Sequence, residues 1–297
     1  MSQAVSPSAE RPYGLQRVTR LWQIARSSVY ALRQRGANPP VPNRRGPRSV
    51  LDDGTLLERI NAALAASPWV GEGYRKVWAR LRADDVRTAP RRVLRVMREA
   101  NLLAPTRAGQ AHGPKAHDGV IVTERPDVRW GTDGTSTLTD EGNATIFVLI
   151  DHYTAECLGI HAARRGTRFE ALEPLRQAIG GSFGEYREGV AVGLELRHDH
   201  GSAFVSDVYQ AELKFLGITS SPSYVREPEG NGCAERFIRT LKEQLLWLQR
   251  FATIAELHAA LQAFRERYNR EWLVQRHGYR TPATVRAEFA AARPAAA

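Results

Sequence analysis

The stretch VRWGTDGTSTLTDEGNATIFVLIDHYTAECLGIHA, residues 128–162, carries the pattern on which the predicted fold depends. Its β-branched and aromatic residues fall into three segments, and turn-forming residues separate them at 139–143 and 151–154. The pattern therefore predicts three successive strands. The run ATIFVLI (144–150) predicts the most apolar of them, and it is far too short to span a bilayer.

Helices and strands are predicted to alternate after this stretch. The expected elements are a helix at 168–180, a strand at 189–199, a helix at 202–217, a strand at 218–224 and a helix at 231–248. The resulting order is β-β-β-α-β-α-β-α. It predicts an α/β domain of the ribonuclease-H-like class, in which helices flank a mixed sheet.

Helices and linkers are predicted before this domain. The expected helices are two short ones within 14–35, followed by others at 54–66, 71–85 and 88–103. Leu15, Val18 and Leu21 form an apolar stripe on the first, and Ser27 or Ser28 could cap the second. Segments rich in Pro, Gly and Arg or His predict linkers at 36–48 and at about 104–126.

The helix predicted at 88–103 has one basic side. Thr88 could cap it, and Pro90 lies in its first turn. The residues of its basic side are Arg91, Arg92, Arg95 and Arg98. Val93, Val96, Met97 and Ala100 fall on the opposite side. This pattern favours a helix-turn-helix that binds DNA, although an ordinary amphipathic helix has the same stripe.

The net charge of +10 is unevenly distributed. Residues 1–118 contain 21 Lys and Arg against 9 Asp and Glu, whereas residues 119–297 contain 21 against 23. A basic segment that contacts phosphates, joined to a near-neutral domain that performs chemistry, accounts for this asymmetry. A solvated basic surface without a nucleic-acid partner is the alternative.

Several classes of protein lack support in this sequence. The N-terminus shows no secretory signal, and Cys157 and Cys233 lie in unrelated contexts, so we expect reduced thiols in a cytosolic protein. No Cys/His zinc spacing and no glycine-rich phosphate loop occur in the sequence. Nucleotide hydrolysis is therefore not expected.

Asp199 in LRHDHGSAF (196–204) stands where a predicted strand ends, and it could be either a helix cap or a metal ligand. Phosphoryl transfer commonly uses two divalent ions about 3.5–4 Å apart, held by hard oxygen ligands. Asp133, on the strand that opens the domain, and Glu235, on the last predicted helix, would complete a set of three carboxylates. Asp207 and Glu243 repeat the Asp199–Glu235 separation, but Asp207 falls inside a predicted helix.

Other acids, and the polar residues near Glu235, are expected to have structural or DNA-contacting roles that fit their positions better. Asp151 is better explained by a hairpin turn, and Glu227 and Glu229 lie in a predicted loop that would position a ligand poorly. Asn231, Arg239 and Lys242 share nearly one helix face with Glu235 and could contact DNA. A surface ion pair between Glu235 and Arg239 is the alternative.

The blocks VRWGTDGTS (128–136), LRHDHGSAF (196–204) and EGNGCAERFIRTLKEQLL (229–246) resemble, in this order, the catalytic blocks of bacterial insertion-sequence transposases. These enzymes have an integrase core related to that of retroviral integrases. The segments 73–103 and 268–289 are similar to the preceding helix-turn-helix and to the C-terminal block of such transposases, so the resemblance covers about residues 65–290.

The resemblance implies a polynucleotidyl transferase of the acidic-triad type. Asp133, Asp199 and Glu235 would bind two Mg²⁺ or Mn²⁺ ions for cleavage of transposon ends and transfer of a DNA 3′-hydroxyl. His198 and His200 would shape the electrostatics of the site without being ligands. Double-stranded DNA is the expected partner, together with further copies of the chain on DNA and an upstream first-frame protein or fusion.

The expected domains are a basic segment with its linker (1–50), a helix-turn-helix-like domain (51–105), a linker (106–126), the integrase core with C-terminal helices (127–290) and a disordered tail (291–297). Two other functions stay open. A DNA-binding regulator would use the α/β domain only as a scaffold. A structure-selective nuclease of the same fold would cut DNA without joining 3′ ends to a target.

Overall fold

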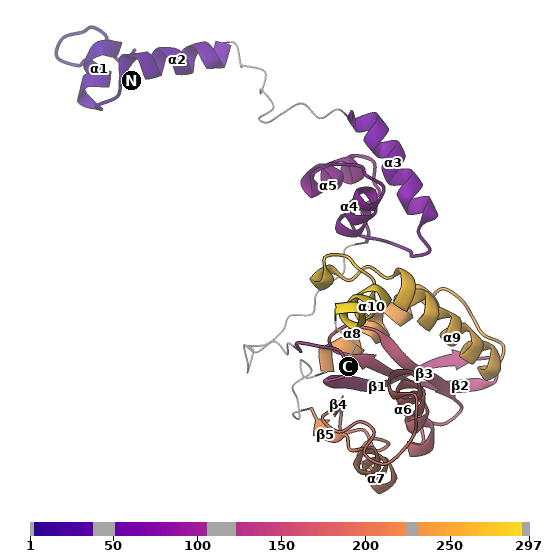
Figure 1. Cartoon of the computed structure of the whole chain (residues 1–297). Helices are drawn as coiled ribbons and strands as arrows, with labels where there is room; N and C mark the ends of the chain where they lie inside the picture. Colours follow the sequence, from indigo (N-terminus) through magenta and orange to yellow (C-terminus); the bar gives the residue numbers. More distant parts are fainter. Residues whose placement is uncertain (1–2, 38–50, 106–122, 224–230, 293–297) are drawn as a thin grey trace. The chain divides into compact units, whose positions relative to one another are not determined.

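The computed structural model describes residues 3–37, 51–105, 123–223 and 231–292, and the chain divides into two units, 1–51 and 52–297. The predicted linkers at 36–48 and 104–126 and the predicted tail lie largely outside the described residues. Figure 1 shows the elements of both units.

The first unit contains the two short helices predicted for it, α1 (Leu15–Leu21) and α2 (Arg26–Ala37). Two details differ from expectation. Helix α2 already begins at Arg26, so Ser27 and Ser28 lie in its first turn and not at its cap. Leu21 is 81% exposed, whereas Leu15 and Val18 are half-buried, so the described part of the unit covers only part of the apolar stripe of α1.

The second unit begins with three helices, α3 (Asp53–Ala66), α4 (Tyr74–Ala83) and α5 (Pro90–Glu99). They pack on one another through fully buried side chains, among them Ile60, Val77 and Met97. Pro90 opens α5 as predicted, whereas the cap position belongs to Ala89. Thr88 accepts a hydrogen bond from Trp78 Nε1 (2.8 Å) with its backbone carbonyl, and its side chain caps nothing.

A five-stranded mixed sheet follows, in the order β3-β2-β1-β4-β5. Its strands are β1 (Arg129–Thr139), β2 (Gly142–Asp151), β3 (Cys157–Ala163), β4 (Glu195–His198) and β5 (Thr219–Pro222). The first three strands pair antiparallel, whereas β4 is parallel to both β1 and β5. This confirms the predicted order and the mixed sheet.

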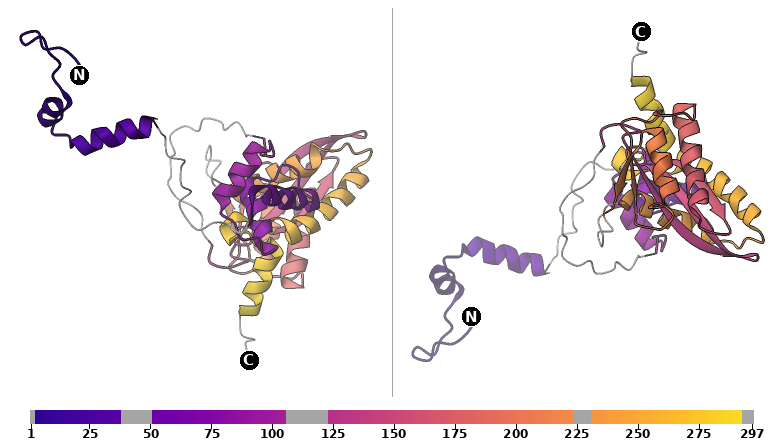
Figure 2. Two further views of the ribbon diagram at one scale, coloured as in Figure 1. Left: turned by 90° about the horizontal axis from the view of Figure 1, so that it is seen from above. Right: turned by 90° about the horizontal axis from the view of Figure 1, so that it is seen from below.

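Helices cover both faces of the sheet (Figure 1). The helices of this domain are α6 (Arg168–Phe183), α7 (Asp207–Leu216), α8 (Gly232–Leu241), the π-helix η2 (Lys242–Leu246), α9 (Ile254–Glu271), the short 3₁₀-helix η3 (Gln275–His277) and α10 (Pro282–Ala292). Those that pack directly on the sheet are α6, α7, α8 and α9. Seen from below, α6 and α7 lie in front of the sheet (Figure 2). Among the described residues, no helix is long and apolar enough to cross a membrane.

Strand β2 separates two hydrophobic cores. Ile146, Val148 and Ile150 pack with α8 and α9, whereas Phe147 and Leu149 point to the opposite side, toward α6 and α7. Neighbouring residues of a strand face opposite sides of the sheet, so a strand covered on both faces needs an unbroken apolar run. The sequence ATIFVLI meets this requirement.

Three predicted elements have different limits in the structure. Strand β4 includes only the last part of the predicted strand, and α7 begins at Asp207 and not at 202. The predicted helix 231–248 is α8 followed by the π-helix η2. No local pattern of residues 231–248 indicates this change of helix type.

Candidate active site

Asp133 lies on β1, and the pairing of this strand determines which face its side chain occupies. Its register partner on β2 is Val148, which belongs to the core under α8 and α9. Directly paired residues of an antiparallel pair share a face of the sheet. Asp133 therefore lies on the side covered by α8, and its carboxylate accepts a hydrogen bond from Gly134 N (2.7 Å).

Asp199 directly follows β4. The parallel pairing of β1 with β4 ends at Gly131 and Arg197, and Asp133 and Asp199 each lie two residues beyond that last pair. Asp199 Oδ1 accepts a hydrogen bond from Gly201 N (2.8 Å) within the turn. The cap of α7 is Ser206, whose side chain accepts from Tyr209 N. The helix-cap explanation of Asp199 is therefore wrong.

Glu235 lies exposed in the first turn of α8, a helix that packs against β1 and β2. The suggested ion pair with Arg239 does not form, because Arg239 Nε donates to Glu243 Oε1 (3.0 Å). Glu243, one member of the alternative acidic pair, is thus part of an i,i+4 surface pair. Its other member, Asp207, is an exposed residue at the start of α7.

The electrostatics link the three acids. Burial raises the pKa of Asp133 to about 6; the Gly134 hydrogen bond lowers this pKa, the charge of Asp199 raises it, and Lys242 lowers it. Although the Glu235 side chain is exposed overall, partial desolvation of its carboxyl group raises its pKa, and the charge of Asp133 raises it further. Asp133 thus interacts with both other acids, as expected where carboxylates share a site.

The donor set has the chemistry that Mg²⁺ or Mn²⁺ requires, namely carboxylate oxygens that repel one another without a cation. Within the described ranges, however, no group of three His, Cys, Asp or Glu side chains is close enough to hold a metal ion as it stands. Asp133 and Asp199 are each hydrogen-bonded to a nearby backbone N–H. Each bond uses one carboxylate oxygen, and a carboxylate has about four lone-pair sites on its two oxygens, so these bonds are compatible with cation binding.

The predicted neighbours of the acids differ in their surroundings. Lys242 acts on the pKa of Asp133 and so lies near the acids, whereas Arg239 is engaged with Glu243. Asn231 is only 5% exposed, and its Nδ2 donates to the Thr132 carbonyl (2.8 Å). Burial removes Asn231 from the surface that would meet DNA, so its predicted DNA contact is replaced by a contact with β1.

His198 also differs from expectation. It is buried, and burial lowers its pKa, so its ring is neutral at pH 7 and adds no positive charge to the site. Its ring nitrogens bond to the Asp199 carbonyl (2.6 Å) and to Ser220 Oγ (2.9 Å), which ties the end of β4 to β5. His200 is exposed beside it.

Asp151 has the structural role predicted for it. Its carboxylate accepts hydrogen bonds from Thr154 N (2.6 Å), Thr154 Oγ1 (2.8 Å) and Asp127 N (2.9 Å). These bonds stabilise the turn between β2 and β3. Glu227 and Glu229 lie outside the described residues.

The basic side of α5 is only partly available to a ligand. Arg92 and Arg95 form ion pairs with Asp53 at the start of α3, at 2.7 and 2.6 Å. Arg91 and Arg98 are exposed. Helical periodicity places all four arginines on one side, but it does not show that another helix carries an acid opposite two of them.

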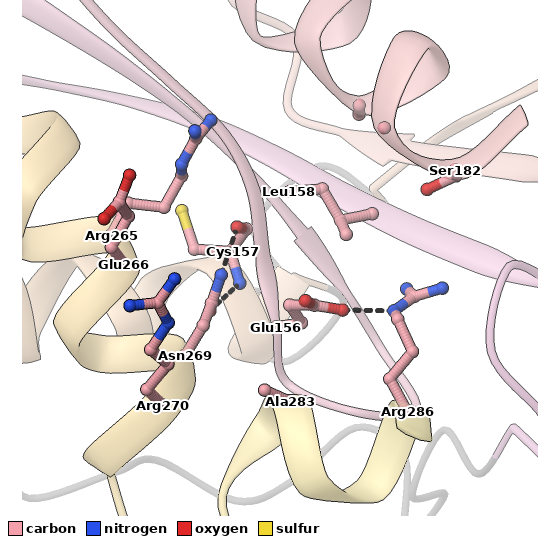
Figure 3. A pocket seen from close by; sticks show the side chains of 12 residues that line it. Glu156, Cys157, Leu158, Ser182, Arg265, Glu266, Asn269, Arg270, Ala283 and Arg286 are labelled. Carbon is pink, nitrogen blue, oxygen red and sulfur yellow. Dashed lines mark hydrogen bonds and ion pairs between the residues drawn. The ribbon is translucent and has the colours of Figure 1, made fainter. Parts of the chain in front are cut away.

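A pocket between β3, α6, α9 and α10 is separate from the acids (Figure 3). Asn269 pairs with the backbone of the edge strand β3 there. Its side-chain amide accepts a hydrogen bond from Cys157 N (2.8 Å) and donates one to the Cys157 carbonyl (2.9 Å). Glu156 and Arg286 form an ion pair at the opposite side of the pocket. None of the three candidate acids lines it.

The sequence did not reveal how the helical domain attaches to the core. Trp69 is 4% exposed and packs edge-on against Phe264 and Trp272, with ring centroids 5.8 and 5.1 Å apart. The backbone of Val70 exchanges two hydrogen bonds of 2.8 Å with the side-chain amide of Gln244 in η2. The three-helix domain thereby contacts the segment that follows α8.

The chain matches two families by sequence. The family described as Integrase core domain matches residues 123–228 and, in a second description with the same name, 216–282. The family described as HTH-like domain matches residues 51–109. Together the matches cover the three helices, the sheet and the helices that flank it.

Individual relatives are distant. An uncharacterised 48.2 kDa protein of insertion element IS2A from Escherichia coli is 27% identical over 82% of this chain and 57% of its own length. The transposase InsD of insertion element IS2 from the same organism is 27% identical over 80% of this chain and 78% of its own. The chain thus spans little more than half of the first relative.

Among solved structures, the catalytic core domain of HTLV-2 integrase in complex with magnesium is similar. It is 18% identical, with a TM-score of 0.41, over 54% of this chain and 97% of its own length.

Proposed function

The chain carries an integrase core domain and an HTH-like domain and is homologous to insertion-element transposases, and on this premise we propose that it cleaves transposon ends and joins their 3′-hydroxyls to DNA. The observation that carries the proposal is that Asp133 and Asp199 each lie two residues beyond the last β1–β4 pair, and that α8, which packs against β1, holds Glu235 in its first turn. The raised pKa values of Asp133 and Glu235 agree with this arrangement. Three acids from β1, the end of β4 and α8 would then act as one site. A domain that served only as a scaffold would gain nothing from neighbouring carboxylates that repel one another.

In this proposal Asp133, Asp199 and Glu235 are the catalytic residues and hold divalent cations, Mg²⁺ or Mn²⁺. The bound cations supply Lewis-acid stabilisation for an in-line displacement at phosphorus. Asp133 pairs with Val148 of β2 and lies two residues beyond the last residue of β1 that pairs with β4, so the antiparallel partner strand fixes its backbone. Lys242, near Asp133, would contact a phosphate of the DNA. Arg239, in the preceding turn, would do so if its exposed ion pair with Glu243 opens.

A joining assay tests the activity. The purified chain would be incubated with Mg²⁺ or Mn²⁺, supercoiled plasmid and a labelled duplex that carries the terminal repeat found beside the gene. Covalent joining of the labelled 3′ end to plasmid supports the proposal. Cutting without joining would indicate a nuclease, and binding without either reaction would indicate a regulator.

The proposed partners are double-stranded DNA, further copies of the chain on DNA, and a first-frame protein fused or bound upstream. The HTH-like domain supports the DNA contact. Adding the upstream protein to the joining assay, in trans or as a fusion, tests whether it is required.

Replacing Arg91 and Arg98 with alanine is expected to weaken DNA binding and to flatten its salt dependence. Each lost phosphate contact reduces the slope of log K against log salt by about 0.9. Fluorescence anisotropy with duplex DNA at several salt concentrations would measure the slope for the full chain. Arg92→Ala is the matched control, because Arg92 pairs with Asp53; it should lower stability and leave the slope unchanged. An unchanged slope in the double variant would show that this side of α5 does not face DNA.

Replacing Asp133 with asparagine is expected to stabilise the metal-free protein above pH 6. The folded-state pKa of Asp133, about 6, lies above its ordinary value, so ionisation of Asp133 costs folded-state stability as the pH rises from about 4 past 6. The increase in melting temperature should therefore be largest near pH 7.5 and shrink toward pH 4.

Differential scanning fluorimetry with EDTA or Mg²⁺ provides the measurement. Mg²⁺ should raise the melting temperature of the wild type more at pH 7.5 than at pH 5, because protons compete for the ligands. Asp140→Asn is the control, since Asp140 is exposed and pairs with Arg250. Equal responses of the two variants would contradict a special environment for Asp133.

A further inference from the structure

Asn231 connects β1, which carries Asp133, with α8, which carries Glu235. Its Nδ2 donates to the Thr132 carbonyl (2.8 Å), and this hydrogen bond is buried. Thr132 precedes Asp133 on β1, and Asn231 precedes Glu235 by one helical turn on α8. This hydrogen bond therefore links β1 to α8 one residue before Asp133 and one helical turn before Glu235.

The Asn231 side chain does not cap its own helix. It occupies the N-cap position of α8, where an asparagine side chain usually accepts a bond from a backbone N–H of the first turn, but it makes no such bond. Its amide points to β1 instead. A residue type favoured for capping is thus used for a contact between elements that are 99 residues apart in the chain.

His152 and Gly131 confine the Asn231 side chain. A Cβ atom at Gly131 would meet Asn231 Oδ1 at 2.7 Å and His152 Nε2 at 2.8 Å, so both side chains lie directly over this glycine. Asn231 and His152 are 5% and 7% exposed, and among the described residues neither Oδ1 nor Nε2 has a hydrogen-bond partner. Buried polar atoms are rarely left in this state, which points to a positional requirement that outweighs its cost.

We propose that Asn231 is a positioning residue that fixes the separation of Asp133 and Glu235 by tying α8 to β1, with Gly131 and His152 holding its amide in place. The inference rests on the proposed function, since it assumes that the two acids act on the same metal ions. Burial separates Asn231 from DNA and from bulk solvent, so it acts through the acids.

The positional role predicts weaker metal binding without loss of the fold. Asn231→Leu keeps the approximate volume of the side chain and removes the amide that donates to the Thr132 carbonyl. Gly131→Ala adds a Cβ atom that would displace Asn231 Oδ1. Groups that orient metal ligands typically change metal affinity about 10–100-fold. We expect both variants to raise the Mn²⁺ dissociation constant of the complex with end DNA about tenfold or more. Both should also raise the Mg²⁺ concentration needed for half-maximal joining.

Thr240→Val is the matched control, because Thr240 is also a buried polar residue of α8 but bonds only to the Arg236 carbonyl of its own helix (3.0 Å). It should leave Mn²⁺ binding unchanged. Free Mn²⁺ would be measured by electron paramagnetic resonance, and folding by circular dichroism melting. The expected pattern is near-native melting of Asn231→Leu with weakened Mn²⁺ binding.

Native Mn²⁺ binding in a folded Asn231→Leu variant would overturn the inference. Failure of both Asn231→Leu and Gly131→Ala to fold would also overturn it, since the contact would then belong to fold stability. Asp133→Asn separates this outcome from failure of the proposed function. If Asp133→Asn keeps metal binding and joining, the proposed function is wrong; if it loses both while Asn231→Leu keeps both, only the positioning role is wrong.

Discussion

Replacing Asp199 with asparagine is expected to reduce end cleavage and 3′-end joining by about 1,000-fold or more, while DNA affinity stays within about twofold of wild type. Asparagine keeps the size of the side chain and its possible turn hydrogen bond to Gly201 N, but it removes the negative charge that a cation needs. The reaction rate should fall while the DNA affinity is kept, because Asp199 lies directly after β4, outside the HTH-like domain.

The matched control for this prediction is Asp207→Asn. Asp207 stands in the same Asp-to-Glu spacing with Glu243, yet it is exposed at the start of α7, and Glu243 pairs with Arg239. Its substitution should leave joining within about twofold of wild type, since most exposed substitutions have small effects. Joining by Asp199→Asn at the wild-type rate with Mg²⁺ would remove Asp199 from the catalytic set.

Gly159→Ala is expected to have the largest effect on stability among the glycine positions described. A Cβ atom at this position of β3 would lie 2.1 Å from the Pro174 carbonyl oxygen and 2.7 Å from its carbonyl carbon. Both are backbone atoms of α6, so the helix would have to move away from the sheet. We expect a loss of about 3 kcal/mol or more, the upper end of overpacking effects.

Thermal melting and urea unfolding would measure the loss. Gly180→Ala is the control on the same helix, because Gly180 is exposed and a Cβ there meets no atom within 4 Å. Since glycine is unfavourable within a helix, this change should stabilise the protein by about 0.5–1 kcal/mol. Melting of Gly159→Ala within about 2 °C of wild type would contradict the close approach of β3 and α6.

Local sequence patterns predicted most elements correctly because their causes are local. The run ATIFVLI predicted a strand, and the structure shows why it is apolar throughout: helices cover both faces of β2. Pro90 marked the first turn of α5, since proline has no N–H to lose there. The strand-end position of Asp199 also followed from the local alternation.

Strand length depended on partners that no local pattern reveals. The sequence 189–199 has strand character throughout, but β4 begins only at Glu195, where pairing with Arg129 of β1 begins. Before that point the backbone bonds to the end of α7, with Gly189 N donating to the Phe215 carbonyl (2.8 Å) and Ala191 N to the Leu216 carbonyl (2.9 Å). A strand extends only as far as another strand lies beside it.

The sequence by itself determined the order of strands and helices, the three candidate acids and the basic character of the N-terminal half, since each depends on residue type and short-range spacing. Only the tertiary structure decided which basic side chains of α5 remain exposed, because Asp53 pairs with Arg92 and Arg95 from another helix. It also decided that Asn231 faces β1 and that Trp69 enters the core. Contacts between residues distant in sequence form only when the packed elements bring them together, and no periodicity within one segment encodes them.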